Sequence, residues 1–193
     1  MLTSLPVHTP NRTKTVVLAG NPNCGKSTIF NALTGFRQRV GNYPGVTVER
    51  RTGWMHSDLG GPRIEIMDLP GTYSLAANAL DESVVLDALL GQHDRLPDVI
   101  VNVVDAANLG RNLFFTTQLL ELGIPVIVAL NMTDIATSRG IAIDVEALVH
   151  ELGVPVTPVV GNRGTGIEAL QRAIVCAADS AATHHCTAFP ECV

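Results

Sequence analysis

The chain has 193 residues, 46% of them hydrophobic and only 4% aromatic, and a formal net charge of −5 at pH 7. This length suits one compact domain, and the aliphatic composition suits an α/β protein with buried parallel strands. The acidic balance argues against a dedicated nucleic-acid-binding surface, which normally carries a basic patch.

The cysteines and the apolar segments indicate the cellular compartment. The four cysteines, at positions 24, 176, 186 and 192, lack the spacing of a disulfide framework, so we expect a reducing compartment. The first twelve residues lack the apolar core of a signal peptide. The longest apolar runs, such as residues 125–130, are far too short to span a bilayer. We therefore expect a soluble cytosolic domain.

Apolar runs of strand length alternate with helical patterns, which is typical of stacked βαβ units. Strands are predicted at residues 15–19, 48–55, 63–67, 99–104, 126–130 and 156–160. Helices are predicted at residues 26–33, 82–90, 111–122, 145–152 and 166–178. Residues 36–46, rich in Gly, Asn and Pro, are predicted to be irregular, and residues 58–61 to form a hairpin turn.

The first predicted strand leads into a segment that matches the phosphate-binding pattern G-x-x-x-x-G-K-[ST] at every specified position. The segment reads Gly20-Asn21-Pro22-Asn23-Cys24-Gly25-Lys26-Ser27, and Thr28 follows it in the predicted helix. Backbone N–H groups of such a loop and the helix N-terminus attract an anion. We expect Lys26 to reach the β- and γ-phosphates and the Ser27 hydroxyl to bind Mg²⁺.

Two further segments resemble nucleotide-dependent switches. Asp68-Leu69-Pro70-Gly71 ends a predicted strand and has the form D-x-x-G, in which the Asp holds Mg²⁺ through water and the Gly N–H faces the γ-phosphate. Upstream, Gly45-Val46-Thr47 places a hydroxyl group where Mg²⁺ and the γ-phosphate could order a loop. Thr47 is the candidate, with Thr34 and Thr52 as alternatives.

The choice of base is expected to come from two later loops. Asn131-Met132-Thr133-Asp134 resembles the guanine motif N-K-x-D with Met in place of Lys, and the Asp carboxylate can accept from two guanine N–H groups. Gly161-Asn162-Arg163 lies where related GTPases have S-A-[KR], so a backbone N–H could reach the guanine O6. Arg163 could stack over the base, or it could be a solvated loop arginine.

These segments together resemble the cytoplasmic G domain of the FeoB family of ferrous iron transporters. The resemblance is carried by the phosphate loop, by residues 39–49, by Asp68-Leu69-Pro70-Gly71-Thr72-Tyr73-Ser74 and by Asn131-Met132-Thr133-Asp134. It implies a P-loop NTPase fold of the Ras-like type, with a mostly parallel sheet of six or seven strands flanked by helices. We assign residues 1–14 to an extension, 15–178 to the G domain and 179–193 to a tail.

The resemblance also implies a function. It implies a guanine-nucleotide switch that binds GTP and GDP with Mg²⁺, belongs to an inner-membrane permease chain and lies at the cytoplasmic face of the bacterial inner membrane. It further implies nucleotide-dependent self-association. Thr72 stands where Ras has its water-orienting glutamine, so we expect slow hydrolysis. In similar GTPases a K⁺ ion stabilises the departing charge, and its side-chain ligand here would be Asn23, helped by carbonyls near residues 41–43.

Several alternatives remain at this point. The chain could be an RNA- or ribosome-associated GTPase, a nucleotide sensor with negligible hydrolysis, or an NTPase with relaxed GTP/ATP choice, since Met132 and Gly161 both depart from the guanine signature. Cys24 beside a helix N-terminus could be a redox-sensitive thiol, although a small structural residue is the simpler interpretation. The tail could also hold a metal cluster, formed by His184, His185, Cys186 and Cys192. The spacing of these residues fits no standard zinc pattern.

Overall fold

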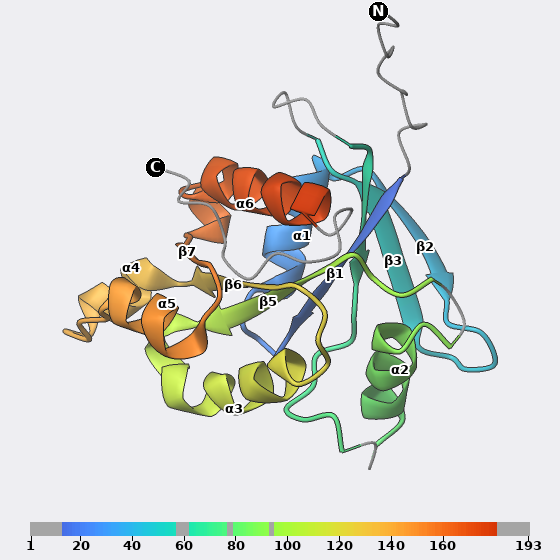
Figure 1. Ribbon diagram of the computed structural model, residues 1–193, viewed down its shortest axis with the longest axis horizontal. Coiled ribbons are helices and arrows are strands. Elements are labelled where there is room, and N and C mark those ends of the chain that lie inside the picture. The colour runs from blue at the N-terminus through green and yellow to red at the C-terminus, as the bar shows by residue number, and fades with distance from the viewer. Residues whose placement is uncertain (1–12, 57–61, 77–78, 93–94, 181–193) are drawn as a thin grey trace, which may run out of the picture.

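The computed structural model describes residues 13–56, 62–76, 79–92 and 95–180, which form one seven-stranded sheet with helices on both faces (Figure 1). The strand order is β2-β3-β4-β1-β5-β6-β7. β2 runs antiparallel to β3 and β3 antiparallel to β4, and every other neighbouring pair is parallel. The strands are β1 (Lys14–Gly20), β2 (Gln38–Asn42), β3 (Glu49–Trp54), β4 (Ile64–Asp68), β5 (Val99–Asp105), β6 (Val126–Asn131) and β7 (Val156–Pro158).

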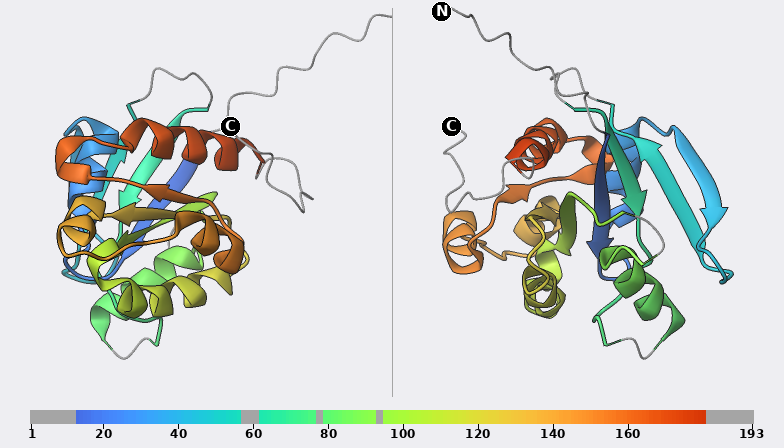
Figure 2. Two further views of the ribbon diagram at one scale, coloured as in Figure 1. Left: turned by 90° about the vertical axis from the view of Figure 1, so that its left-hand side faces the viewer. Right: turned by 45° about the vertical axis from the view of Figure 1, so that its right-hand side comes forward.

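The helices divide between the two faces of the sheet (Figure 2). α1 and α6 cover one face, and α2, α3 and α5 pack on the other. The α-helices are α1 (Lys26–Thr34), α2 (Leu80–Leu89), α3 (Leu109–Leu120), α4 (Thr133–Ser138), α5 (Val145–Leu152) and α6 (Ile167–Ser180). Two short 3₁₀ helices are η1 (Ala106–Asn108) and η2 (Gly161–Arg163). No helix in the described part of the chain combines the length and the hydropathy of a membrane span.

The central strands are mostly apolar on both of their sides because both faces of the sheet are covered there. In β5, Val99, Val101 and Val103 belong to the core under α1 and α6. Ile100 packs with α2 and α3, and Val104 packs near α5. This explains why the sequence shows Val and Ile at successive positions here rather than an alternating pattern; the one polar residue among them, Asn102, is buried and donates to the Thr116 hydroxyl.

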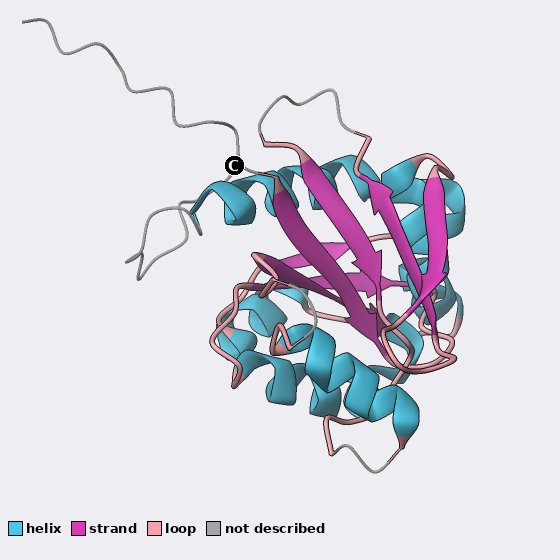
Figure 3. Cartoon of the chain, turned by 90° about the vertical axis from the view of Figure 1, so that its right-hand side faces the viewer, coloured by secondary structure: helices cyan, strands magenta, loops and turns pink. Residues whose placement is uncertain are grey.

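Parallel strands place the loops that follow them at one edge of the sheet. β1, β5 and β6 are neighbouring parallel strands, so their carboxyl ends lie side by side. Figure 3 shows the strands of the sheet with helices packed on both sides. The loop after β1 and the loop after β6 therefore meet, although more than a hundred residues separate them. Ligands of open α/β sheets bind at this edge.

The sequence-based prediction was wrong for part of residues 36–46, because Gln38–Asn42 forms β2. All five residues of this edge strand are exposed, so no apolar alternation marks it, and its pairing with β3 defines it. Helix α4 was not predicted either: it has six residues and buries only Ala136. β7 ends at Pro158, two residues before the predicted strand end. The predicted turn at residues 58–61 lies outside the described residues.

Candidate functional site

The loop between β1 and α1 is held in a conformation that requires glycine. Gly25 has φ +87°, and a Cβ atom there would lie 2.2 Å from the Nδ2 atom of Asn131. A Cβ atom on Gly20 would lie 2.5 Å from the carbonyl oxygen of Val103. Asn23 also has positive φ, at +64°, and its side chain is exposed at the tip of the loop. The glycines are therefore needed for close packing of the loop against β5 and β6.

At the N-terminus of α1, Lys26 and Ser27 meet the carboxylate of Asp68. Lys26 Nζ donates to Asp68 Oδ1 at 2.6 Å, and Ser27 Oγ donates to Asp68 Oδ2 at 3.5 Å. Asp68 ends β4, which pairs with β1 so that Leu18 lies opposite Asp68. A hydroxyl and a carboxylate oxygen are the ligands that Mg²⁺ prefers, so the donor set fits this ion.

The D-x-x-G segment packs directly against the phosphate loop. A Cβ atom on Gly71 would lie 3.0 Å from the Cα atom of Pro22, and the N–H of Thr72 donates to the carbonyl of Gly20 at 3.3 Å. The buried Thr72 hydroxyl donates to the carbonyl of Ser74 at 2.9 Å. The Thr72 hydroxyl is therefore engaged within its own segment.

The predicted switch residue Thr47 does not join this cluster. Thr47 is exposed in the turn between β2 and β3, next to Val46 and after Gly45, which has φ +77°. Within the described residues, no hydrogen bond joins Thr47 to Ser27 or Asp68. The structure thus brings Lys26, Ser27, Asp68 and Gly71 together but leaves Thr47 apart.

Asn131 connects the phosphate loop to the last predicted loop. This buried residue ends β6; its Nδ2 atom donates to the carbonyl of Cys24 at 2.9 Å, and its Oδ1 atom accepts from the Gly161 N–H at 3.1 Å. Two segments that are distant in sequence are thereby fixed to one side chain. The sequence alone indicated Asn131 as part of a motif but did not indicate these partners.

Met132 and Asp134 lie on the start of α4. Met132 precedes the helix with φ +62°, and its Cε atom lies 3.3 Å from where a Cβ of Gly25 would be. Asp134 is in the first turn of α4 and keeps 26% of its side-chain surface exposed. This carboxylate is therefore accessible beside the phosphate loop.

The segment Gly161–Arg163 forms η2, close to Asn131 and α1. A Cβ atom on Gly161 would lie 2.8 Å from the Cδ1 atom of Ile29, which accounts for glycine at this position. Asn162 is exposed. Arg163 Nη2 lies 3.6 Å from Asp134 Oδ2, so Arg163 is paired rather than solvated alone.

The predicted site residues differ in their exposure to solvent. The buried ones are Gly20, Asn21, Cys24, Asp68, Leu69 and Asn131. The half-buried ones are Pro22, Gly25, Lys26, Val46, Pro70, Gly71, Met132, Asp134 and Gly161. The exposed ones are Asn23, Ser27, Thr28, Gly45, Thr47, Asn162 and Arg163.

Cys24 is poorly suited to redox chemistry. Burial raises the pKa of its thiol from 9.0 to about 11, although the nearby positive charge of Lys26 acts in the opposite direction. The thiolate, which is the reactive form, is therefore scarce at neutral pH. This favours the structural interpretation of Cys24.

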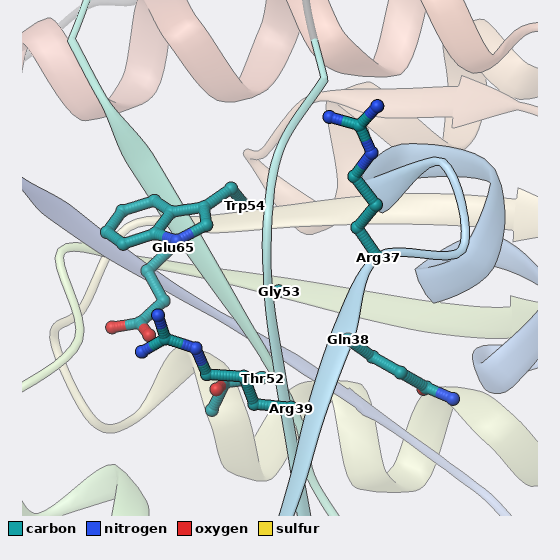
Figure 4. Close-up of a pocket in the computed structure, with 7 residues that line it drawn as sticks. All are labelled: Arg37, Gln38, Arg39, Thr52, Gly53, Trp54 and Glu65. Atoms are coloured by element: carbon teal, nitrogen blue, oxygen red, sulfur yellow. The ribbon is translucent and has the colours of Figure 1, made fainter.

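A groove lies away from this site. It has a volume of about 190 Å³ and crosses the β2–β3–β4 end of the sheet, and none of the predicted site residues lines it. Figure 4 shows Trp54, Glu65 and Arg39 gathered on one side of β3, with Gln38 pointing away from them.

In the part of the chain that the structure describes, no group of three or more His, Cys, Asp or Glu side chains could hold a metal ion. The tail residues His184, His185, Cys186 and Cys192 lie outside that part.

Comparisons with known proteins agree on one family. The model of the FeoB_N family, ferrous iron transport protein B, matches residues 14–174. The chain is 54% identical over 164 residues to the Fe(2+) transporter FeoB of Salmonella typhimurium and 53% identical to that of Escherichia coli K12. Each match covers 83% of this chain but 21% of the relative, so the chain spans about a fifth of the length of these relatives.

Solved structures give the same result. The cytosolic domain of L. pneumophila FeoB is 51% identical, with a TM-score of 0.79, over 85% of this chain and 63% of that one. A GDP-bound mutant of the S. thermophilus FeoB G-domain is 45% identical, with a TM-score of 0.80, over 92% of this chain and 65% of that one. With the fold, the phosphate loop and these matches in agreement, the chain belongs to the FeoB family and contains its P-loop G domain.

Proposed function

We propose that this chain binds GTP and GDP with Mg²⁺ and hydrolyses GTP slowly, as the nucleotide switch of a ferrous iron transporter at the cytoplasmic face of the bacterial inner membrane. The observation that carries the proposal is the position of Asn131. Its hydrogen bonds to Cys24 and Gly161 hold a phosphate-binding loop and a base-reading loop next to one another. The GDP-bound S. thermophilus relative supports the same choice of ligand.

The phosphate end of the site is suited to an anion. Loop N–H groups, the N-terminus of α1 and the Lys26 ammonium would surround the β- and γ-phosphates. Asn21 Nδ2 is buried and has no hydrogen-bond partner among the described residues. Because a buried donor without an acceptor costs free energy, an acceptor in the loop would stabilise this arrangement.

Ser27 and Asp68 are the residues proposed to hold Mg²⁺, which would neutralise charge on the bound phosphates. Binding requires Lys26 to move from the carboxylate of Asp68 toward the phosphates. Thr47 would reach this cluster only if the turn between β2 and β3 moved, which is the behaviour expected of a switch segment. The N–H of Gly71 would then face the γ-phosphate.

The position of Thr72 supports the proposal that hydrolysis is slow. Its hydroxyl is buried and hydrogen-bonded to Ser74, so it does not orient a water molecule as the glutamine of Ras does. We therefore expect the chain to bind and position the nucleotide, while the Thr72 side chain does not orient the attacking water.

Asn23 is the residue proposed to hold K⁺, which would stabilise the negative charge that develops on the departing phosphate. Its exposed side chain at the tip of the loop is free to take a ligand. We predict faster GTP hydrolysis in KCl than in NaCl at equal ionic strength, and loss of this difference in Asn23→Ala. Equal rates in the two salts for the unaltered chain would contradict the assignment.

The function is tested by calorimetry with GDP, a non-hydrolysable GTP analogue and ADP in the presence of Mg²⁺. We expect both guanine nucleotides to bind and ADP to bind far more weakly, because adenine lacks the two N–H donors that Asp134 accepts. Failure of both guanine nucleotides to bind would overturn the proposal. Equal binding of ADP would instead support the alternative of relaxed base choice.

The proposal also includes two partners of this domain: a membrane permease segment and a second copy of the chain. The permease segment would lie in the remainder of a longer chain, since the match covers only 21% of the relative. Nucleotide-dependent self-association predicts a larger mass in light scattering with the GTP analogue than with GDP. A filter-binding assay with bulk RNA at moderate salt tests the RNA-associated alternative.

A further inference from the structure

Both carboxylate oxygens of Asp134 have partners within the chain. Oδ1 accepts a hydrogen bond from the Ile135 N–H at 3.0 Å. Oδ2 lies 3.6 Å from Nη2 of Arg163, and the two side chains are 26% and 68% exposed, respectively. The ion pair is therefore open to water on the arginine side, and an incoming ligand could displace the guanidinium without unfolding its surroundings.

The backbone of Arg163 keeps its side chain close to Asp134. The Arg163 N–H donates to the carbonyl of Val160 at 2.9 Å, and Val160 also forms a bridge with Thr165. Gly161 is attached to Asn131, three residues before Asp134. The exposed guanidinium can therefore move while its backbone stays in place.

The two purines guanine and hypoxanthine make different demands on this carboxylate. Guanine presents two N–H donors, at N1 and at its 2-amino group, and a carboxylate pairs with both only by using both oxygens. Hypoxanthine, the base of inosine nucleotides, has the N1 donor but lacks the 2-amino group. Guanine must therefore replace Arg163 at one oxygen, whereas hypoxanthine leaves that oxygen to the guanidinium.

We infer that Arg163 modulates the base preference of Asp134 by competing with the guanine 2-amino group for its carboxylate. This inference rests on the proposed function, in which Asp134 reads the base. Arg163 lowers the affinity for guanine nucleotides and leaves the affinity for inosine nucleotides nearly unchanged. It thereby narrows the preference for GDP over IDP and favours release of the guanine nucleotide.

The size of the effect follows from the exposure of the pair. An exposed ion pair changes an equilibrium by no more than about fivefold. Salt screens such a pair, so the effect should disappear when the ionic strength approaches about 1 M, where the screening length is about 3 Å. A stacking role for Arg163 would not show this dependence on both salt and the 2-amino group.

The experiment measures dissociation constants of GDP and IDP by calorimetry with Mg²⁺, for the unaltered chain and for Arg163→Ala, at low and high salt. In the variant at low salt, we expect GDP to bind about two to five times more tightly, with IDP changing by less than about twofold. The ratio of IDP to GDP dissociation constants should therefore rise, and at high salt the two proteins should agree. Arg172→Ala is the matched control, because Arg172 pairs with Glu168 on the surface of α6 and the charge change is the same.

Three outcomes would overturn the inference. Equal weakening of GDP and IDP in Arg163→Ala would mean that the guanidinium packs on the base. Unchanged binding of both would mean that the ion pair does not compete. Equal tightening of GDP and IDP would mean that the 2-amino group is not what displaces Arg163. Failure of the unaltered chain to bind GDP at all is a distinct result, which would refute the proposed function itself.

Discussion

Asn131 shows how one side chain can determine the arrangement of a site. Its amide donates to Cys24 and accepts from Gly161, and it is 3% exposed. In Asn131→Asp, a carboxylate oxygen would face the Cys24 carbonyl, and two buried acceptors would repel each other. We expect the free energy of unfolding to fall by about 2–4 kcal/mol, and GDP binding to weaken with it.

Urea denaturation and calorimetry check this prediction. The control is Asn42→Asp, which makes the same chemical change on the exposed edge strand β2. Stability of Asn131→Asp equal to that of the control would show that the two hydrogen bonds do not support the site.

Cys24 gives a second prediction at the level of single residues. Because burial raises the pKa of its thiol to about 11, iodoacetamide at pH 7.5 should label the exposed Cys176 well before Cys24. The raised pKa stabilises the fold below about pH 9, and this contribution is lost as the pH rises toward 11. Site-resolved mass spectrometry measures the two rates, and both thiols should react alike in denaturant. Equal rates in the folded chain would contradict the buried, protonated thiol.

At the scale of elements, helix α3 holds the segment that follows Asp68–Gly71. Gln118 Oε1 accepts from the Leu75 N–H at 3.0 Å, and Arg111 stacks over the Tyr73 ring with 4.2 Å to its centroid. Both contacts are near the surface, so we expect them to restrain this segment while contributing little to global stability.

Gln118→Ala tests this restraint. We expect faster amide hydrogen exchange at residues 73–76, with a change in global stability of less than about 1.5 kcal/mol, the usual net value of one hydrogen bond. Gln171→Ala removes a comparable side-chain bond, which Gln171 on α6 donates to the carbonyl of His56, and should leave exchange at residues 73–76 unchanged. Unaltered exchange in Gln118→Ala would show that α3 does not restrain the segment.

For the whole molecule, ligand binding and folding should be coupled. A ligand at a hundred times its dissociation constant adds about 2.7 kcal/mol to the stability of the folded state. For a domain of this size that amount corresponds to a rise in Tm of about 5–10 °C. We predict this rise with GDP and Mg²⁺, and a much smaller one with ADP at the same concentration, in thermal denaturation. Equal shifts would contradict selection of guanine through Asp134.

The central strands, the long helices and the phosphate loop could be predicted from the amino-acid sequence alone. Strands such as Val99–Asp105 carry apolar residues on both of their sides, interrupted only by the buried Asn102 before Asp105 ends the strand, because helices cover both faces. The loop from Gly20 to Ser27 has a fixed spacing because its backbone must turn tightly between a strand and a helix. These signals are local, so they could be recognised without a structure.

Three features could be seen only in the folded chain: strand β2, the hydrogen bonds of Asn131 and the pairing of Arg163 with Asp134. β2 is exposed along its length, and only its hydrogen bonds to β3 define it. Asn131 contacts Cys24 across 107 positions of sequence. Arg163 meets Asp134 because β6 and β7 are neighbouring parallel strands whose following loops converge. Partners that are distant along the chain leave no local pattern, since their distance is determined by the order of strands in the sheet.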